Sequence, residues 1–302
     1  MTPASSSVRR AQPLLGTFVE IAASGAPRAV LHAGIGQAFR AVADVHHLMS
    51  FHESDSDVSR LNREAALRPV RVHRWTYEVL RLASELYEAS GGLFDIAIAD
   101  ALQRLGLLPR AGDDRLAPAR AQSPEPSVAL LSDDHVRFTR RDIRIDLGGI
   151  AKGFAVDRAV ATLRAGGVPR GLVNAGGDVA VFGPEPYTVD VRDPRHRGRI
   201  LLRVPIRDEA IASSGHAFDR ATGVASMAIV DPGSGRPAAA VHGASVRAPS
   251  CVIADALTKL VVLAGQSADA LLERYGASAL LVPCEGDIVM SHTWAQEVRS
   301  AS

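Results

Sequence analysis

Ile-Asp-Leu-Gly-Gly-Ile-Ala-Lys-Gly-Phe-Ala-Val-Asp, residues 145–157, predicts a strand that runs directly into a helix. Residues 141–145 alternate charged and β-branched side chains, which is typical of a half-buried strand. The apolar residues from Phe154 to Leu163 recur instead at helical spacing. The change of period places a strand-to-helix junction at the glycine pair.

This junction has the features of an anion-binding site. Gly148 and Gly149 allow the backbone to approach a ligand closely, and the first N–H groups of the new helix point at the same place. Asp146 and Lys152 bring opposite charges to it, so a phosphate-bearing ligand fits there. The alternative is that the glycines only solve a tight turn. The spacing matches neither a P-loop nor a Rossmann fingerprint.

Composition describes an ordinary globular protein. The chain has 302 residues, 47% hydrophobic content and a net charge of +1, which argues against a nucleic-acid partner bound by bulk charge. The basic cluster at 192–199 is interpreted as a solvated hairpin turn. Cys251 and Cys284 have no metal-spaced partners, so neither a disulfide framework nor a zinc site is predicted.

The N-terminal region predicts no export signal or membrane span, because the apolar run Leu14–Val19 is too short for either. We therefore expect a cytoplasmic protein. Residues 13–22 are expected to form the opening strand.

Helices are predicted at 29–50, 76–90 and 251–263, a strand pair within 128–145, a hairpin from 187–191 and 200–204, and further strands at 209–214, 244–248 and 279–283. Residues 172–181 are expected to form a buried strand that Gly176 and Gly177 interrupt as a bulge or a close approach. Two interpretations stay open for residues 54–62, a capped loop or a ligand-facing one. Asp95, which follows a glycine pair, either caps the next helix or faces a ligand. Residues 109–127 are expected to be a flexible surface insertion.

In combination and in this order, the motifs resemble the ApbE-type FAD:protein FMN transferase family. The resemblance runs from about Pro13 to the terminal strand at 279–283, and it implies a divergent member of the family. A single domain is expected at 9–298. The motifs that carry it are Met49-Ser50-Phe51, Ser59-Arg60-Leu61-Asn62, Gly92-Leu93-Phe94-Asp95, Asp146 to Gly153, Asn174 to Asp178, Ser213-Ser214-Gly215, Asp231-Pro232 with Gly235, and Ala254-Asp255-Ala256-Leu257.

The resemblance implies a mixed α+β, T-fold-like architecture of two lobes with the flavin site between them. It also implies FAD as substrate, Mg²⁺ as cofactor, and transfer of FMN to a Thr or Ser hydroxyl of a target flavoprotein. Such proteins are often exported, which makes a periplasmic location the alternative to the cytoplasm. The positions implied to contact FAD are Met49, Ser50, Phe51, Leu93, Phe94, Asp95, Asp146, Lys152 and Ile229. Asp255 and Lys152 are the implied catalytic residues, and Gly149, Asp255 and Thr258 are the implied metal ligands.

Two positions depart from the family pattern. Ala228 stands where the family usually has a histidine, and Lys259 stands where it usually has a metal-binding threonine four residues after Asp255. Thr258 could reach the metal after a modest helix rotation, since residues three and four apart share a helix face. Equally, Lys259 could pair with Asp255 and neutralise it. If Lys259 takes the place of the usual metal ligand, its ammonium could stand near the pyrophosphate and supply the positive charge that magnesium supplies elsewhere.

These departures leave more than one function open. The first hypothesis is an active flavin transferase. The second is an FAD-binding protein or slow FAD pyrophosphatase without acceptor transfer, and the third is a structural protein that binds no flavin.

Overall fold

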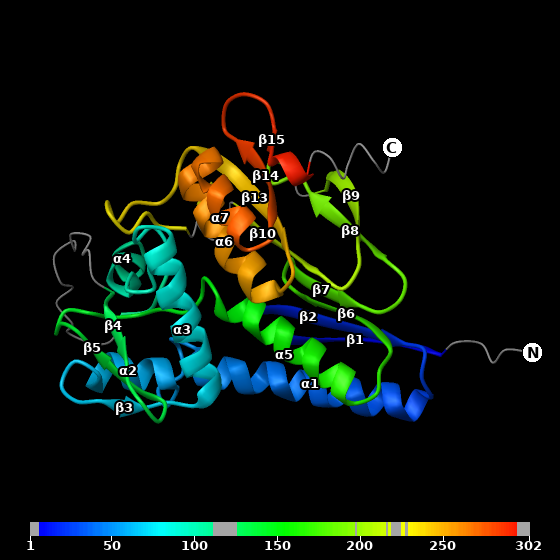
Figure 1. Cartoon of the computed structure of the whole chain (residues 1–302), viewed down its shortest axis with the longest axis horizontal. Coiled ribbons are helices and arrows are strands. Elements are labelled where there is room, and N and C mark those ends of the chain that lie inside the picture. The colour runs from blue at the N-terminus through cyan, green and yellow to red at the C-terminus, as the bar shows by residue number, and fades with distance from the viewer. Residues whose placement is uncertain are drawn as a thin grey trace, which may run out of the picture.

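The computed structural model describes residues 6–110, 126–196, 198–215, 217–218, 225–226 and 229–294. Its main sheet, shown with the rest of the fold in Figure 1, contains eight strands among these residues, and every strand pairs antiparallel with its neighbours. In spatial order the strands are β1 (Ser7–Leu14), β2 (Thr17–Ser24), β6 (Arg170–Ala175), β7 (Asp178–Phe182), β10 (Ala210–Gly215), β13 (Val241–Ala248), β14 (Ser278–Pro283) and β15 (Val289–Met290).

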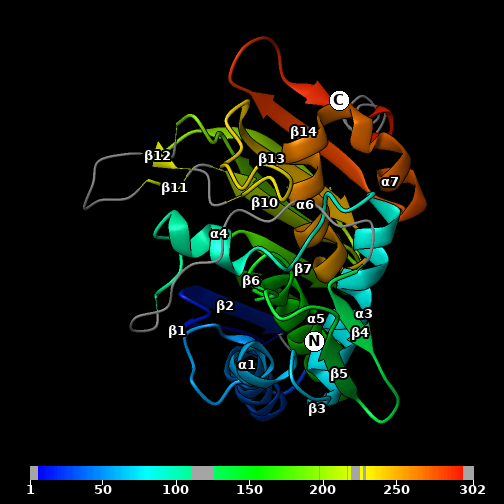
Figure 2. The ribbon, with the colours of Figure 1, turned by 90° about the vertical axis from the view of Figure 1, so that its left-hand side faces the viewer.

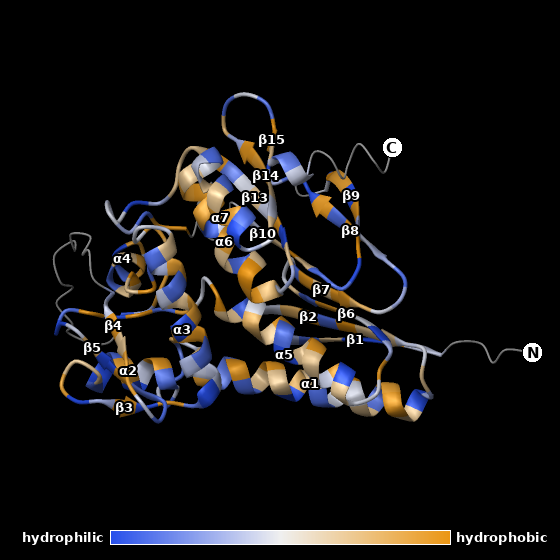
Figure 3. Cartoon of the chain, viewed as in Figure 1, coloured by the Kyte–Doolittle hydropathy of each residue, from blue (hydrophilic) through white to orange (hydrophobic). Residues whose placement is uncertain are grey.

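Three long helices, α1 (Arg28–Met49), α5 (Ala151–Ala165) and α6 (Cys251–Ala264), cover one face of this sheet (Figures 1 and 2). Helix α1 carries both hydrophobic and hydrophilic residues along its length (Figure 3), and Leu31, Ile35 and Val42 are fully buried. Helix α6 continues through a 3₁₀ turn, η1 (Gly265–Ala268), into α7 (Asp269–Arg274).

The other face of the sheet packs against a hairpin of β8 (Tyr187–Arg192) and β9 (Ile200–Ile206). This hairpin is the one that the sequence predicts. Its Val191, Val204 and Ile206 pack in one cluster with sheet residues and with the buried Trp294.

A smaller lobe lies beside the sheet and consists of residues 51–147 as far as they are described (Figure 1). It contains α2 (Asp57–Glu64), α3 (Arg74–Ala89), α4 (Ala99–Arg104) and a sheet of β3 (Val70–Arg71), β5 (His135–Phe138) and β4 (Val128–Leu130). Outside both lobes' sheets, β11 (Ala217–Phe218) pairs with β12 (Ala225–Ser226). One buried apolar cluster extends from the long helices into α2 and α3. The α+β class and the two lobes agree with the sequence-based expectation, whereas the predicted insertion and domain end fall partly on residues 111–125 and 295–298, outside the described ranges.

Two expected single strands are hairpins. The strand expected at 13–22 turns at Leu15 and Gly16, whose φ angles are +56° and +69°, and so separates β1 from β2. The strand expected at 172–181 reverses at Gly176 and Gly177, with φ of +68° and +108°, and so separates β6 from β7. Apolar residues continue on both sides of each turn, so the sequence pattern does not reveal the reversal. Gly176 and Gly177 form a two-residue hairpin turn and not a bulge.

The segment 141–145 is the third correction, because it pairs with no strand among the described residues. Ile143 and Ile145 are buried as the alternation predicts, but the hairpin that precedes them ends at Phe138. The backbone of Ile145 bonds instead to the side chain of Asn62, and the N–H of Asp146 donates to the carbonyl of Ile96 at 2.9 Å. An alternation of polar and apolar side chains indicates that one side of the segment is buried. It does not indicate whether a neighbouring strand is available for pairing.

Both interpretations of residues 54–62 expected a loop, but the structure has a capped helix from Asp57 onward. Ser56 accepts a hydrogen bond from the N–H of Ser59 at 3.0 Å and starts α2.

Within the described residues, one stretch is long and apolar enough to cross a membrane, Cys251–Arg274. It comprises α6, η1 and α7, and α6 packs against α5, β10 and β13. Its apolar character is that of a central core helix, and it also carries the buried Asp255.

Helices α5 and α6 cross at Gly153. A Cβ on this residue would stand 2.3 Å from the carbonyl oxygen of Cys251 and 2.8 Å from the Cβ of Asp255. The N–H of Gly153 donates to Asp255 Oδ2 at 2.9 Å. Only a residue without a side chain allows this approach.

A second contact fixes the same two helices. The carboxylate of Asp157 on α5 accepts the N–H groups of Cys251 and Val252, each at 2.8 Å, and so caps the start of α6. Burial raises the pKa of Asp157 to about 6, although both N–H groups oppose this rise. The acidic residue that ends the motif at 145–157 therefore has a structural role that the sequence analysis did not assign.

Gly153→Ala tests the crossing. We expect the free energy of unfolding to fall by about 1–3 kcal/mol, because the added methyl group meets backbone atoms that cannot move away cheaply. Gly36→Ala on α1 is the matched control, since among the described residues a Cβ there meets nothing nearer than Arg40 at 4.0 Å. The free energy of unfolding of the control should rise by about 0.5–1 kcal/mol, because alanine has a higher helix propensity than glycine. Urea unfolding of both variants checks this, and stabilisation by both substitutions would contradict the close crossing.

Candidate functional site

A pocket of about 690 Å³ opens between the long helices and the smaller lobe. Its walls come from the end of α1, the loops at 93–98 and 146–149, α4 and the chain after it, the end of β10, and residues 229–232. All nine predicted FAD contacts line it, namely Met49, Ser50, Phe51, Leu93, Phe94, Asp95, Asp146, Lys152 and Ile229. The structure therefore brings together residues that lie up to 180 positions apart in the sequence.

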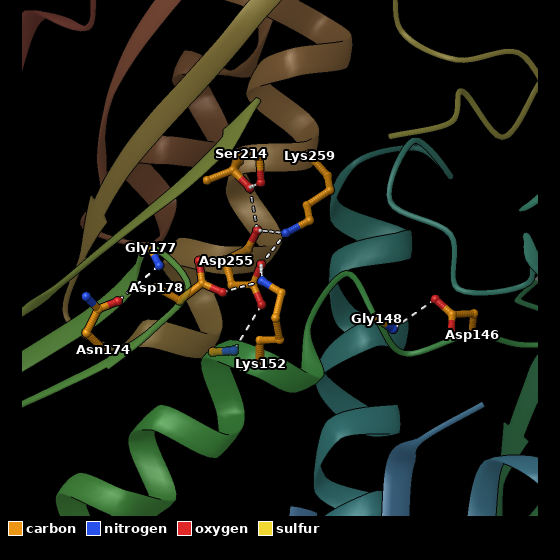
Figure 4. Close-up of polar contacts among 11 residues, drawn as sticks. Asp146, Gly148, Lys152, Asn174, Gly177, Asp178, Ser214, Asp255 and Lys259 are labelled. Carbon is orange, nitrogen blue, oxygen red and sulfur yellow. Dashed lines mark hydrogen bonds and ion pairs between the residues drawn. The ribbon is translucent and has the colours of Figure 1, made fainter. Parts of the chain in front are cut away.

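Four charged residues, Lys152, Asp178, Asp255 and Lys259, form a cluster (Figure 4), and its two lysines line the pocket. Lys152 at the start of α5 forms an ion pair with Asp178, the first residue of β7, and its Nζ is 3.8 Å from Asp255 Oδ1. Lys259, one turn after Asp255 on α6, forms an ion pair with the same Oδ1 and donates to the carbonyl oxygen of Asp255 at 2.8 Å. Both lysines line the pocket, whereas the two aspartates are almost fully buried behind them.

The buried charges set the pKa values of this charged cluster. Burial by itself would lower the pKa of Lys152, but Asp255 and Asp178 outweigh it and hold that pKa above its ordinary value. Burial also opposes ionisation of Asp255, yet Lys152 and Lys259 hold its pKa below the usual range. Asp178 behaves differently, because burial and the neighbouring Asp255 raise its pKa. Lys152 and Asp255 therefore carry their charges at neutral pH.

The predicted metal ligands lie close together but are already occupied. Asp255 Oδ1 faces two ammonium groups and Oδ2 accepts the N–H of Gly153. Thr258 Oγ1 donates to the carbonyl oxygen of Asp255 and is 2.7 Å from Ser214 Oγ. Lys259 fills the space toward Gly149, with its Cε 3.6 Å from where a Cβ on that glycine would stand.

This donor set does not fit a magnesium ion. Mg²⁺ requires oxygen ligands at short distance and in near-octahedral order. A divalent ion about 4 Å from one ammonium group is repelled by roughly 8 kcal/mol at an effective dielectric constant of about 20. With two ammonium groups at Oδ1, the magnesium site implied by the resemblance is filled by Lys259.

The loop at 146–149 presents its polar groups to the pocket through a local turn. Asp146 Oδ2 accepts the N–H of Gly148 at 2.9 Å. Burial raises the pKa of Asp146, and the Gly148 N–H and nearby His52 oppose that rise. Asp95 makes a similar turn, accepting the N–H of Ala97 at 2.8 Å, so it both lines the pocket and organises the chain that enters α4.

Asn62 holds this loop in place from the smaller lobe. Its Nδ2 donates to the carbonyl oxygen of Ile145 at 2.9 Å, and its Oδ1 accepts the N–H of the same residue at 2.8 Å. The amide thus pairs with the backbone as a neighbouring strand would. Asn62 belongs to a motif of the resemblance, but the sequence gives no indication that a residue 83 positions away is its partner.

Asp178 is another residue whose role the sequence analysis did not assign. It begins a strand in which every residue is buried, Asp178 to Phe182. A carboxylate among buried apolar residues requires a charged or hydrogen-bonding partner, and this signal was available in the sequence. Ala228, the other departure from the family pattern, lies outside the described residues.

Fold and site together define an α+β protein with a pocket that is lined by apolar residues and by two lysines close to a helix N-terminus. The model described as the ApbE family matches residues 15–281, and this chain belongs to that family. It is 30% identical to an FAD:protein FMN transferase of Treponema pallidum, over 90% of this chain and 83% of that protein. It is also 30% identical to an FAD:protein FMN transferase of Rhodobacter capsulatus, although it spans only 50% of that longer relative.

Solved structures agree with this assignment. The crystal structure of the ApbE protein from Thermotoga maritima matches with a TM-score of 0.82 and 26% identity, over 97% of this chain and 99% of that one. The flavin transferase ApbE from Vibrio cholerae matches with a TM-score of 0.80 and 23% identity, over the same shares of the two chains, which supports the fold.

Asn62→Ala tests the support of the loop. We expect the free energy of unfolding to fall by about 1–3 kcal/mol, since two partly buried backbone groups lose their partners. FAD affinity should fall as well, because Asp146 follows the released segment. Ser59→Ala on the same helix is the control. Urea unfolding and FAD titration measure both effects, and equal results for the two variants would contradict the role of Asn62.

Asp95→Ala and Asp146→Ala should weaken FAD binding more than they weaken the fold, because both side chains line the pocket. Asp142→Ala, on the exposed stretch before the loop, is the control and should leave affinity unchanged. The measurements are the FAD dissociation constant and the melting temperature. A large drop in melting temperature with unchanged FAD affinity would assign both carboxylates to turn formation alone.

Proposed function

We propose that this chain is an FAD:protein FMN transferase, which cleaves the FAD pyrophosphate and attaches FMN to a Thr or Ser hydroxyl of a target flavoprotein. The observation that carries the proposal is the convergence of Lys152 and Lys259 on one end of a pocket lined by every predicted FAD contact. A pocket of about 690 Å³ is in the range that encloses an organic cofactor. Family membership supports the same reaction.

The proposed reaction is a phosphoryl transfer. The acceptor hydroxyl oxygen forms a bond to the flavin-side phosphorus, and the bond from that phosphorus to the bridging oxygen breaks. AMP leaves with the electron pair of the broken bond, and the hydroxyl proton is released. Such a step needs positive charge at the bridging and terminal phosphate oxygens.

The residues of this chain divide that work. Lys152, which lines the pocket at the first turn of α5, contacts the phosphates, and the positive end of the α5 helix dipole lies at the same place. Asp255 is fully buried and does not line the pocket, so its role in the proposal is to position the two lysines. The apolar residues Leu102, Leu107 and Leu108 form a wall suited to a flat ring system. No step is assigned to magnesium, since the donor set does not fit it.

The partners in this proposal are FAD and an acceptor flavoprotein. The cytoplasmic location stays a prediction from the sequence.

Transfer is tested by incubating the protein with FAD and an acceptor flavoprotein domain that carries a Thr acceptor motif. We expect a covalent FMN adduct in the mass spectrum of the acceptor and an equal amount of AMP. Lys152→Met should abolish both, and the Asp142→Ala control should behave as the wild type. Release of FMN and AMP without labelling would favour the pyrophosphatase hypothesis. Absence of FAD binding would contradict both hypotheses.

A further inference from the structure

The chain contains only two lysines, Lys152 and Lys259, against 32 arginines. Elsewhere in the described residues the ion pairs use arginine or histidine, for example Arg195 with Asp193 and Arg247 with Glu209. Both lysines instead meet at the same carboxylate oxygen, Asp255 Oδ1. Lysine carries a compact point charge with three rotatable donors, whereas arginine carries a planar fork, and the former resembles a small cation more closely.

The ammonium group of Lys259 occupies the place where the resemblance implies a bound metal ion, between Asp255 and Gly149. The Lys259 side chain reaches from α6 across Asp255 toward Gly149 at the start of α5. Two of its donors are engaged by Asp255, at Oδ1 and at the backbone carbonyl oxygen. Among the described residues, this leaves a third N–H for an oxygen atom in the pocket that Lys259 lines.

Thr258 does not restore a metal site beside it. Its hydroxyl lies on the buried side of α6, fully covered, and bridges the carbonyl oxygen of Asp255 and Ser214 Oγ. The bridge joins α6 to β10 and fixes the rotation of the helix. Thr258 therefore stabilises the helix in the orientation that sends Lys259 into the pocket.

We propose that Lys259 Nζ supplies, beside Lys152, the fixed positive charge for the FAD pyrophosphate, so that this protein binds FAD and transfers FMN without a divalent cation. The inference rests on the proposed transferase function. Lys259 contacts a phosphate oxygen in place of a metal ion, and Asp255 acts as the positioning residue that anchors the ammonium group.

The small number of lysines allows a direct test in the unmodified protein. Protein labelled with carbon-13 at the lysine ε position gives two side-chain NMR signals, and Lys259→Arg identifies the signal of Lys259. Sodium pyrophosphate and FAD should each shift both signals, and MgCl₂ alone should shift neither. A saturable shift of the Lys259 signal with MgCl₂, or a pyrophosphate response from Lys152 alone, would overturn the proposal.

Substitution of Lys259 provides the second test. The FAD dissociation constant of the wild type should be the same in EDTA and in MgCl₂. Lys259→Thr should lose about tenfold or more in FAD affinity in EDTA, as expected for the loss of a charged hydrogen bond, and should regain part of it with MgCl₂. Loss of wild-type FAD binding in EDTA, or an identical magnesium titration for the variant, would overturn the proposal.

The two proposals fail in different ways. If the acceptor is never labelled while the lysine signals respond to pyrophosphate and ignore MgCl₂, the transferase function fails and the charge role of Lys259 stands. If the acceptor is labelled only when MgCl₂ is present, the transferase function stands and the role of Lys259 fails.

Discussion

The contact between α5 and α6 at Gly153 is the constraint on which the rest of the structure depends. At this point the backbone of α5 touches that of α6, and the N–H of Gly153 binds Asp255 Oδ2. Asp157, one turn further along α5, caps the start of α6. These contacts fix Lys152, the residue before Gly153, against a carboxylate that is 103 positions away in the sequence. These contacts hold the loop before α5 and the part of α6 that carries Lys259 in fixed positions, and both contribute residues to the pocket wall.

The charged cluster of Lys152, Asp178, Asp255 and Lys259 has a cost in folding stability. Taking carboxylates and ammonium groups out of water costs several kcal/mol per ion, and a buried ion pair often stabilises a protein no more than an apolar pair would. Here Lys152 and Lys259 form ion pairs with Asp178 and Asp255, and both lysines line the pocket. Departures from local stability rules concentrate at functional sites. The arrangement prepares positive charge at the place where a phosphate would arrive, without reorganisation when it binds.

Local periodicity in the sequence predicted the long helices and the β8–β9 hairpin. The family resemblance implied nine residues of the pocket wall, but it did not include the leucines at 102, 107 and 108. The sequence did not predict the reversals at Gly16 and at Gly176, where apolar residues continue on both sides of the turn. It also did not predict the pairing of Asn62 with Ile145 or that of Asp178 with Lys152. Both join segments that only tertiary packing brings together, so no local pattern contains them. The pairing of Lys259 with Asp255 was visible as one of two open possibilities, since the residues are one helical turn apart.

The central claim is that an ammonium group and not a divalent cation stands at Asp255. Anomalous diffraction from crystals grown with FAD and Mn²⁺ tests this most directly, because manganese would reveal any divalent site at that carboxylate. The account predicts no anomalous peak at Asp255 Oδ1, with Lys259 Nζ within hydrogen-bonding distance of a pyrophosphate oxygen. A manganese peak bound to Oδ1, with Lys259 turned away, would contradict it.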